Sequence, residues 1–118
     1  MDLDAIRNYC LKKPGVTESL PFDEDSPVYK VMNKIFLIMN LTQPLSINVK
    51  SDPELAVELR EKYSFIIPGY HMNKIHWNTV ILESRVPEKL LKEMIDNSYA
   101  LIVKRLPIKA QNELKQYK

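Results

Sequence analysis

Glycine is scarce in this chain of 118 residues, which contains only Gly15 and Gly69. Loops that cradle phosphate in nucleotide hydrolases and dinucleotide-dependent oxidoreductases need several glycines at fixed spacing, because their backbone must approach the ligand closely. Neither a Walker loop nor a dinucleotide fingerprint can be written on this sequence. The shortage of glycine therefore argues against nucleotide hydrolysis and hydride transfer.

Cysteine and histidine are also in short supply, with Cys10, His71 and His76 as the full complement. A single cysteine forms no internal disulfide, and its place in an apolar helical pattern favours a small buried hydrophobe over a nucleophile. The two histidines are five residues apart in a non-helical segment, without the additional ligands of a zinc site. No local motif supports a catalytic triad. We expect no metal, no cofactor and no catalytic residue, and therefore a protein that is not an enzyme.

Long apolar runs are missing too, since no stretch approaches the roughly 20 residues of a spanning helix. The first residues, Met1 to Asp4, are acidic where a secretory signal would be basic. We expect a cytoplasmic protein. With 45% hydrophobic and 27% charged residues, the chain has the composition of a folded globule, and its length suits one domain over residues 1–118.

The net charge of +2 is small, but it is unevenly distributed along the chain. Residues 1–59 hold six basic and nine acidic residues, whereas residues 60–118 hold eleven and six. The last stretch, 104–118, has five basic residues against Glu113 alone. This asymmetry is compatible with an anionic partner, and equally with a solvated helix end whose cations are favoured by the helix dipole.

Hydrophobic periodicity predicts an α+β fold. The expected elements, in chain order, are a helix over 3–13, strands over 16–20, 28–31, 35–39 and 45–50, a helix over about 52–63, two strands between 65 and 82, and a long helix that Pro107 ends, with a short amphipathic tail after it. We expect two layers in the order α-β(3-4)-α-β(2)-α, with helices covering one face of an antiparallel sheet.

Three local patterns make this prediction more specific. Residues 45–50 alternate strictly between apolar and polar, which predicts a strand with one buried face and one wet face. Residues 32–34 are predicted to connect a hairpin, with Asn33 tolerating a positive φ. Asp52 and Pro53 suit the N-cap and the first position of a helix. The loop with the acidic run 23–25 lacks the glycine and ligand spacing of a calcium site and is predicted to be solvated.

The segment from Pro68 to Trp77, with the sequence PGYHMNKIHW, resembles the signature of the MmcQ/YjbR family. Further similar stretches, in the family's order, are 13–18, 21–22, 28–31, 34–36, 49–53 and 98–99. The resemblance spans nearly the whole chain. It implies an α+β fold similar to that of secretion chaperones, and a DNA-binding role attached to a double wing of strand hairpins.

The leading hypothesis is a DNA-binding module that contacts phosphates weakly through its hairpins and basic residues. The candidate contact residues are Lys30, Lys34, Lys50, His71, Lys74, His76, Trp77, Lys104 and Arg105.

Other interpretations stay open at this point. Tyr70, Met72 and Trp77 could instead anchor the core, since large aromatic side chains are mostly buried, and lysines on sheet edges also prevent aggregation. The fold resemblance favours a chaperone-like module that receives a protein or peptide at a sheet face or edge. A pocket around the Tyr70–Trp77 segment would favour a small-molecule binder. We expect a monomer with no membrane partner.

Overall fold

The computed structural model describes residues 1–69, 72–83 and 85–117 and confirms the α+β prediction. The elements are α1 (Leu3–Leu11), β1 (Val16–Ser19), β2 (Val28–Val31), β3 (Lys34–Asn40), β4 (Ser46–Lys50), α2 (Pro53–Lys62), β5 (Ile66–Pro68), β6 (Trp77–Ile81), α3 (Glu88–Lys104) and α4 (Ile108–Leu114). Six strands form one sheet in the order β1-β2-β3-β4-β6-β5, and every neighbouring pair is antiparallel.

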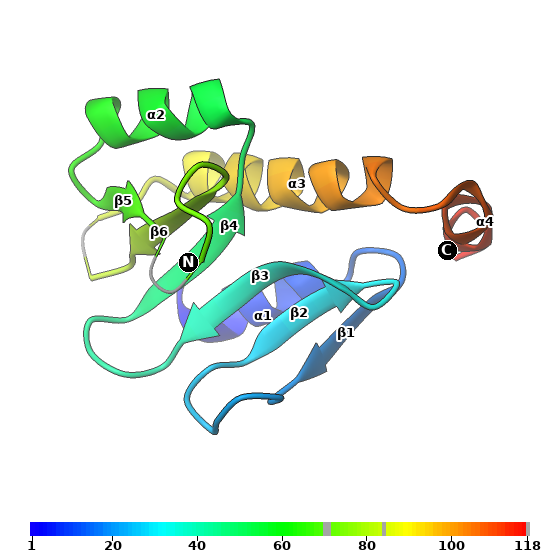
Figure 1. Cartoon of the computed structure of the whole chain (residues 1–118). Coiled ribbons are helices and arrows are strands. Elements are labelled where there is room, and N and C mark those ends of the chain that lie inside the picture. Colours follow the sequence, from blue (N-terminus) through cyan, green and yellow to red (C-terminus); the bar gives the residue numbers. More distant parts are fainter. Residues whose placement is uncertain (70–71, 84, 118) are drawn as a thin grey trace.

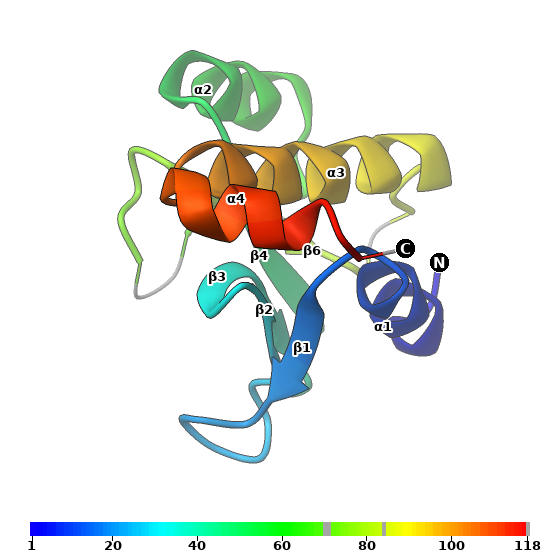
Figure 2. The same ribbon diagram turned by 90° about the vertical axis from the view of Figure 1, so that its right-hand side faces the viewer.

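The helices pack against one face of this sheet, as the sequence predicts. Helix α1 lies behind β2 and β3 in Figure 1, α3 runs along the upper side of the sheet, and Figure 2 shows α4 crossing near the C-terminal end of α3. Helix α2 covers the same face at its β5–β6 end, where the Asn78 side chain donates to the carbonyl of Ala56 at 3.2 Å. Buried side chains on this face include Leu37, Ile47 and Val80, which pack with the inner sides of the helices. No helix of the described residues covers the opposite face, which we call the open face.

Side-chain caps begin two of the helices. The Asp2 carboxylate accepts a hydrogen bond from the amide of Ala5 at 2.8 Å, at the start of α1. Asp52 accepts from the amide of Glu54 at 3.1 Å, and Pro53 occupies the first turn of α2. Both contacts satisfy amide groups that have no partner inside the helix. The predicted start of the second helix is confirmed.

The β2–β3 hairpin turns more tightly than the sequence prediction. Met32 and Asn33 both have positive φ, 47° and 69°, and Lys34 already belongs to β3. Two left-handed residues in a two-residue loop match the twist of an antiparallel hairpin. Just beyond the turn, the register shifts at Phe36, and this bulge lets Phe36 and Leu37 both point into the core.

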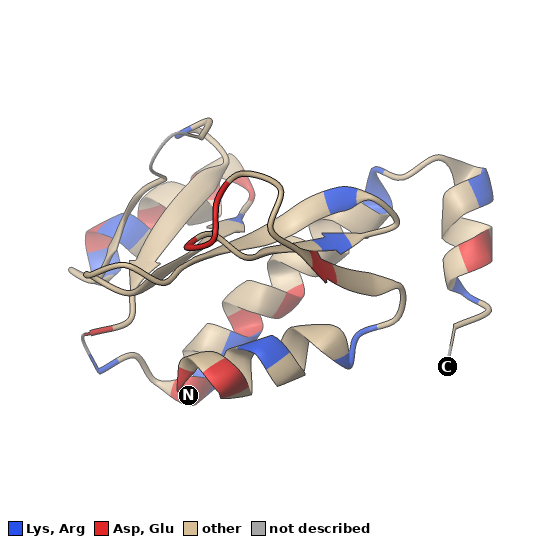
Figure 3. Ribbon diagram, turned by 90° about the horizontal axis from the view of Figure 1, so that it is seen from below, with Lys and Arg blue, Asp and Glu red and all other residues tan. Residues whose placement is uncertain are grey.

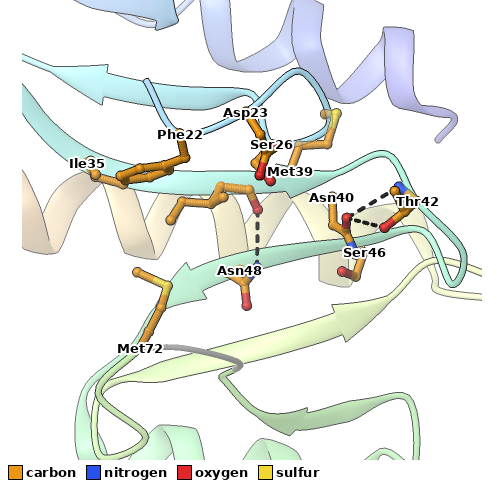
Figure 4. Close-up of a pocket in the computed structure, with 11 residues that line it drawn as sticks. Phe22, Asp23, Ser26, Ile35, Met39, Asn40, Thr42, Ser46, Asn48 and Met72 are labelled. Atoms are coloured by element: carbon orange, nitrogen blue, oxygen red, sulfur yellow. Dashed lines mark hydrogen bonds between the residues drawn. The ribbon is translucent and has the colours of Figure 1, made fainter. Parts of the chain in front are cut away.

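Strand β4 departs from the predicted pattern of one buried and one wet face. Ser46 is 1% exposed and Asn48 is 7% exposed, so its polar face is buried as well. The physical reason is the central place of β4 between β3 and β6, where the Thr79 side chain donates to Asn48 and Ser46 lies near Asn40 and Thr42 (Figure 4). The alternation identified which residues share a face, but the prediction that the second face is wet was wrong.

Candidate functional site

Five of the predicted contact residues lie on or just beyond four elements at one end of the sheet. They are Lys30, Lys34, Lys50, Lys104 and Arg105, which we call the basic end. The hairpin supplies Lys30 and Lys34, and β4 ends at Lys50. Figure 3 shows blue positions along the hairpin at the same end of the molecule as the blue segment where α3 ends.

Ser98 on α3 fixes the position of Lys50. Its buried hydroxyl donates to the carbonyl of Phe36 at 2.5 Å and accepts from the amide of Lys50 at 2.9 Å. The end of β4 is thereby tied to the helix that carries Arg105 just beyond its last turn. Partial burial and the nearby positive charge of Arg105 lower the pKa of the Lys50 ammonium. Two cations from distant parts of the sequence are therefore held close enough to repel one another.

Among residues 1–69, 72–83 and 85–117, no carboxylate forms an ion pair with these five side chains. The three ion pairs of these ranges lie elsewhere and join Arg7 with Glu18, Lys13 with Asp96, and Lys92 with Glu88. None of these pairs includes a residue of the basic end. An unbalanced group of cations of this kind attracts anions.

Trp77, in contrast, is enclosed in the structure. Only 9% of this residue is exposed, and a Cβ added at Gly69 would lie 2.9 Å from the Trp77 Cβ. Glycine is required there because the backbone passes so close to the tryptophan. Since its ring has little surface on which a base could stack, we leave Trp77 out of the proposed contact surface.

The rest of the segment before β6 is held by its own hydrogen bonds. The Lys74 ammonium donates to the carbonyl of Gly69 at 3.1 Å, and the Asn73 side chain accepts from the amide of Ile75 at 2.8 Å. Arg60 on α2 donates to the carbonyl of Lys74 and, at 2.6 Å, to the Asn78 side chain. Lys74 therefore has a structural contact, separate from the basic end.

The histidines do not join the basic end in the described part of the chain. His76 is half-buried, and its backbone carbonyl accepts a hydrogen bond from the amide of Ser51 at 2.7 Å. This bond joins the segment to the end of β4. His71 lies outside the described residues. Cys10 is fully buried, as the sequence predicts, and burial raises the pKa of its thiol to about 12, so that the thiolate is suppressed.

A cavity of about 590 Å³ opens on the face of the sheet that no described helix covers (Figure 4). Its floor is formed by β3 and β4, with Ile38 and Asn48 as cross-strand partners. The loop between β1 and β2 supplies Phe22 and Asp23, and Met72 stands on the opposite side. The cavity has mixed character, with apolar walls and polar groups at its floor.

The polar groups on the cavity floor have spare hydrogen-bonding capacity. The Ser46 hydroxyl makes no hydrogen bond to the described residues and opens on the cavity, since no fully buried side-chain nitrogen or oxygen of the described residues lacks a partner. Asn48 accepts a hydrogen bond from Thr79, but its amide nitrogen makes only a long contact, at 3.5 Å, with its acceptor among the described residues, the carbonyl of Ile38. Polar groups that face a cavity and have hydrogen-bonding capacity left can pair with a ligand, so this floor suits a ligand with polar atoms.

Sequence reasoning missed Phe22, Ser46 and Asn48 as candidate site residues. The alternation of residues 45–50 placed Ser46 and Asn48 on the non-core face, and that was the available signal. Nothing in the sequence indicated that a loop more than twenty residues earlier would bring Phe22 to the same cavity. The cavity is therefore a product of tertiary structure.

The described ranges contain neither a cluster of metal-ligating side chains nor a membrane-spanning helix. Within residues 1–69, 72–83 and 85–117, no three His, Cys, Asp or Glu side chains converge as metal ligands would. No helix among these residues combines the length and apolar character needed to cross a bilayer.

Comparison with known proteins places the chain among bacterial relatives of similar length. The family model described as YjbR matches residues 11–101. The uncharacterised protein YjbR of Escherichia coli K12 is 32% identical over 91% of this chain and 92% of its own length. The uncharacterised protein YbdF of Escherichia coli O157:H7 is 33% identical over 95% of this chain and 93% of its own.

Solved structures show the same fold. A crystal structure of a Deinococcus radiodurans protein with the domain DUF419 matches with a TM-score of 0.88 and 38% identity, covering 96% of this chain and 87% of the other. A crystal structure of a Pseudomonas syringae protein matches with a TM-score of 0.75 and 28% identity, covering 86% of this chain and 98% of the other. The similarity of fold thus extends over most of the chain.

Proposed function

The chain belongs to the YjbR family, and we propose that it binds DNA through phosphate contacts made by the basic end. The observation that carries this proposal is the convergence of five cations without a carboxylate partner among the described residues. The lowered pKa of Lys50, caused by burial and by Arg105, supports it, because a bound phosphate would relieve the repulsion between these two cations.

The expected affinity is modest and depends on salt. A protein that neutralises a few phosphates releases their counterions, so the logarithm of the binding constant falls with the logarithm of salt concentration by about 0.9 per phosphate contacted. With a net charge of only +2, the protein has little long-range attraction to add. We therefore expect binding that is measurable at low ionic strength and weakens steeply as salt is raised.

Fluorescence anisotropy of a labelled DNA oligonucleotide, measured between about 20 and 200 mM salt, tests the proposal. The informative variant combines Lys34→Ala, Lys104→Ala and Arg105→Ala, all at exposed positions that make no ion pair among the described residues. Its affinity should fall at least about tenfold. The slope of the logarithm of the binding constant against the logarithm of salt concentration should decrease in magnitude by up to about 3.

A matched control removes the same charge elsewhere. Lys62→Ala, Arg85→Ala and Lys89→Ala are also exposed, and they lie on α2 and around the start of α3. The control should keep most of the affinity. Absence of binding at the lowest salt, or an equal loss in both triple variants, would contradict the proposal.

A further inference from the structure

We propose that the cavity on the open face receives the base of an unpaired nucleotide, whose phosphate lies against Lys30 and Lys50. This inference rests on the proposed function and deepens it, because it identifies the preferred nucleic acid as a single strand. The recognised unit is a planar base joined to a phosphate, either free or within a strand.

The cavity floor matches the edge of a heterocyclic base. Ser46 lines the cavity floor with a hydroxyl that makes no hydrogen bond to the described residues and can donate or accept. Asn48 adds an amide nitrogen whose contact with the carbonyl of Ile38 is long, at 3.5 Å. Ring nitrogens and carbonyl oxygens of a base are suitable partners for such groups.

The cavity walls match the faces of a base. Phe22 is 65% exposed, an unusual state for a large aromatic residue, and its ring stands over the open face beside Ile35. Figure 4 shows Met72 on the other side of the cavity. Aromatic side chains stack on bases with little dependence on sequence, so Phe22 suits this role.

Two lysines are strand neighbours of residues that line the cavity. Lys50 follows Asn48 by two residues on the same strand face, about 7 Å along β4. Lys30 is the cross-strand partner of Ile35, which itself lines the cavity. A base held over the floor therefore has its sugar and phosphate directed toward two lysines.

The acidic loop favours one orientation of the ligand. Asp23 lines the cavity, and one of its carboxylate oxygens accepts from the amide of Asp25 at 2.8 Å. Its negative charge repels a phosphate, and its second oxygen can accept from an exocyclic amino group. Asp23 therefore favours a base that carries an amino group and disfavours a phosphate on its own side of the cavity.

The test compares a labelled single strand, the duplex of the same sequence and free adenosine monophosphate at one salt concentration. The single strand should bind at least about tenfold more tightly than the duplex, because a paired base cannot enter the cavity. Phe22→Ala should weaken single-strand binding roughly 5- to 150-fold and leave duplex binding unchanged. Val57→Ala, which removes an exposed apolar side chain on α2, is the matched control and should change neither.

Free adenosine monophosphate distinguishes the two sources of the nucleotide. Displacement of the strand at millimolar concentration, with shifts of the Ser46 and Asn48 amide resonances, would indicate that a free nucleotide suffices. Binding of the strand alone would assign the site to single-stranded nucleic acid.

The inference would be overturned if single strand and duplex bound equally and Phe22→Ala altered neither. In that case the basic-end variants would still weaken both, so the proposed function would survive. If no nucleic acid bound but the mononucleotide did, the proposed function would fail and the cavity site would stand.

Discussion

Ser98→Ala is the substitution whose cost can be worked out most directly from the structure. The Ser98 hydroxyl is fully buried on α3 and satisfies two backbone groups at once, the carbonyl of Phe36 at 2.5 Å and the amide of Lys50 at 2.9 Å. Alanine keeps the packing of the Cβ but leaves both backbone groups without this partner. Each buried group left unsatisfied costs about 1–3 kcal/mol, and the better helix propensity of alanine returns about 0.5 kcal/mol.

We therefore expect the free energy of unfolding to fall by about 2–5 kcal/mol, a large share of the total for a domain of this size. Equilibrium urea denaturation followed by circular dichroism measures this difference. Asn97→Ala is the matched control, because Asn97 is exposed on the same helix and gains the same helix propensity. A loss below about 1 kcal/mol relative to that control would refute the reasoning, since it would mean that water or a backbone shift satisfies both groups.

Two further perturbations have defined outcomes. Gly15→Ala should destabilise the fold by about 1–2 kcal/mol through backbone strain alone, since φ is +71°. The new Cβ would also lie 2.5 Å from the Leu114 side chain, which adds to the loss. The double variant with Leu114→Ala should keep the strain but lose that contact, so urea denaturation should show that the two single losses do not add. Burial raises the pKa of Glu18, but hydrogen bonds from Arg7 and Tyr29 outweigh it and lower the pKa overall. A carboxyl with a lowered folded-state pKa contributes stability above its unfolded value of 4.5, and this stability is lost as the pH falls through the folded value. Glu18→Gln should therefore make the free energy of unfolding depend less steeply on pH in acid. Thermal melts below and above pH 4.5 measure this dependence, and an unchanged slope would contradict the prediction.

Elements that depend on local chemistry were predictable from the sequence. Asp52 and Pro53 begin α2 because a cap and a residue without an amide proton both suit the first turn. Pro107 follows the end of α3, which runs from Glu88 to Lys104 and is followed by the predicted short helix. The order of elements and the single helix-covered face followed from these signals and from periodicity.

Features that depend on distant contacts were not predictable in the same way. The bulge at Phe36 exists because Phe36 and Leu37 both enter the core, and strict alternation gives no sign of it. The proximity of Lys50 and Arg105 spans more than fifty residues and requires the packing of α3 on the sheet. The candidate lysines could be named from the sequence, but their convergence could not.

The polar floor of the open face is difficult to explain by stability alone. Alanine or valine at the position of Ser46 would serve a purely structural strand as well, because the hydroxyl has no partner among the described residues to lose. If the floor is structural, Ser46→Ala leaves or raises the free energy of unfolding and has no effect on nucleotide binding. If the floor recognises a base, the same variant keeps its stability and binds the single strand several-fold more weakly. Measuring both quantities on this one variant separates the two explanations, because a folding defect would lower stability together with binding.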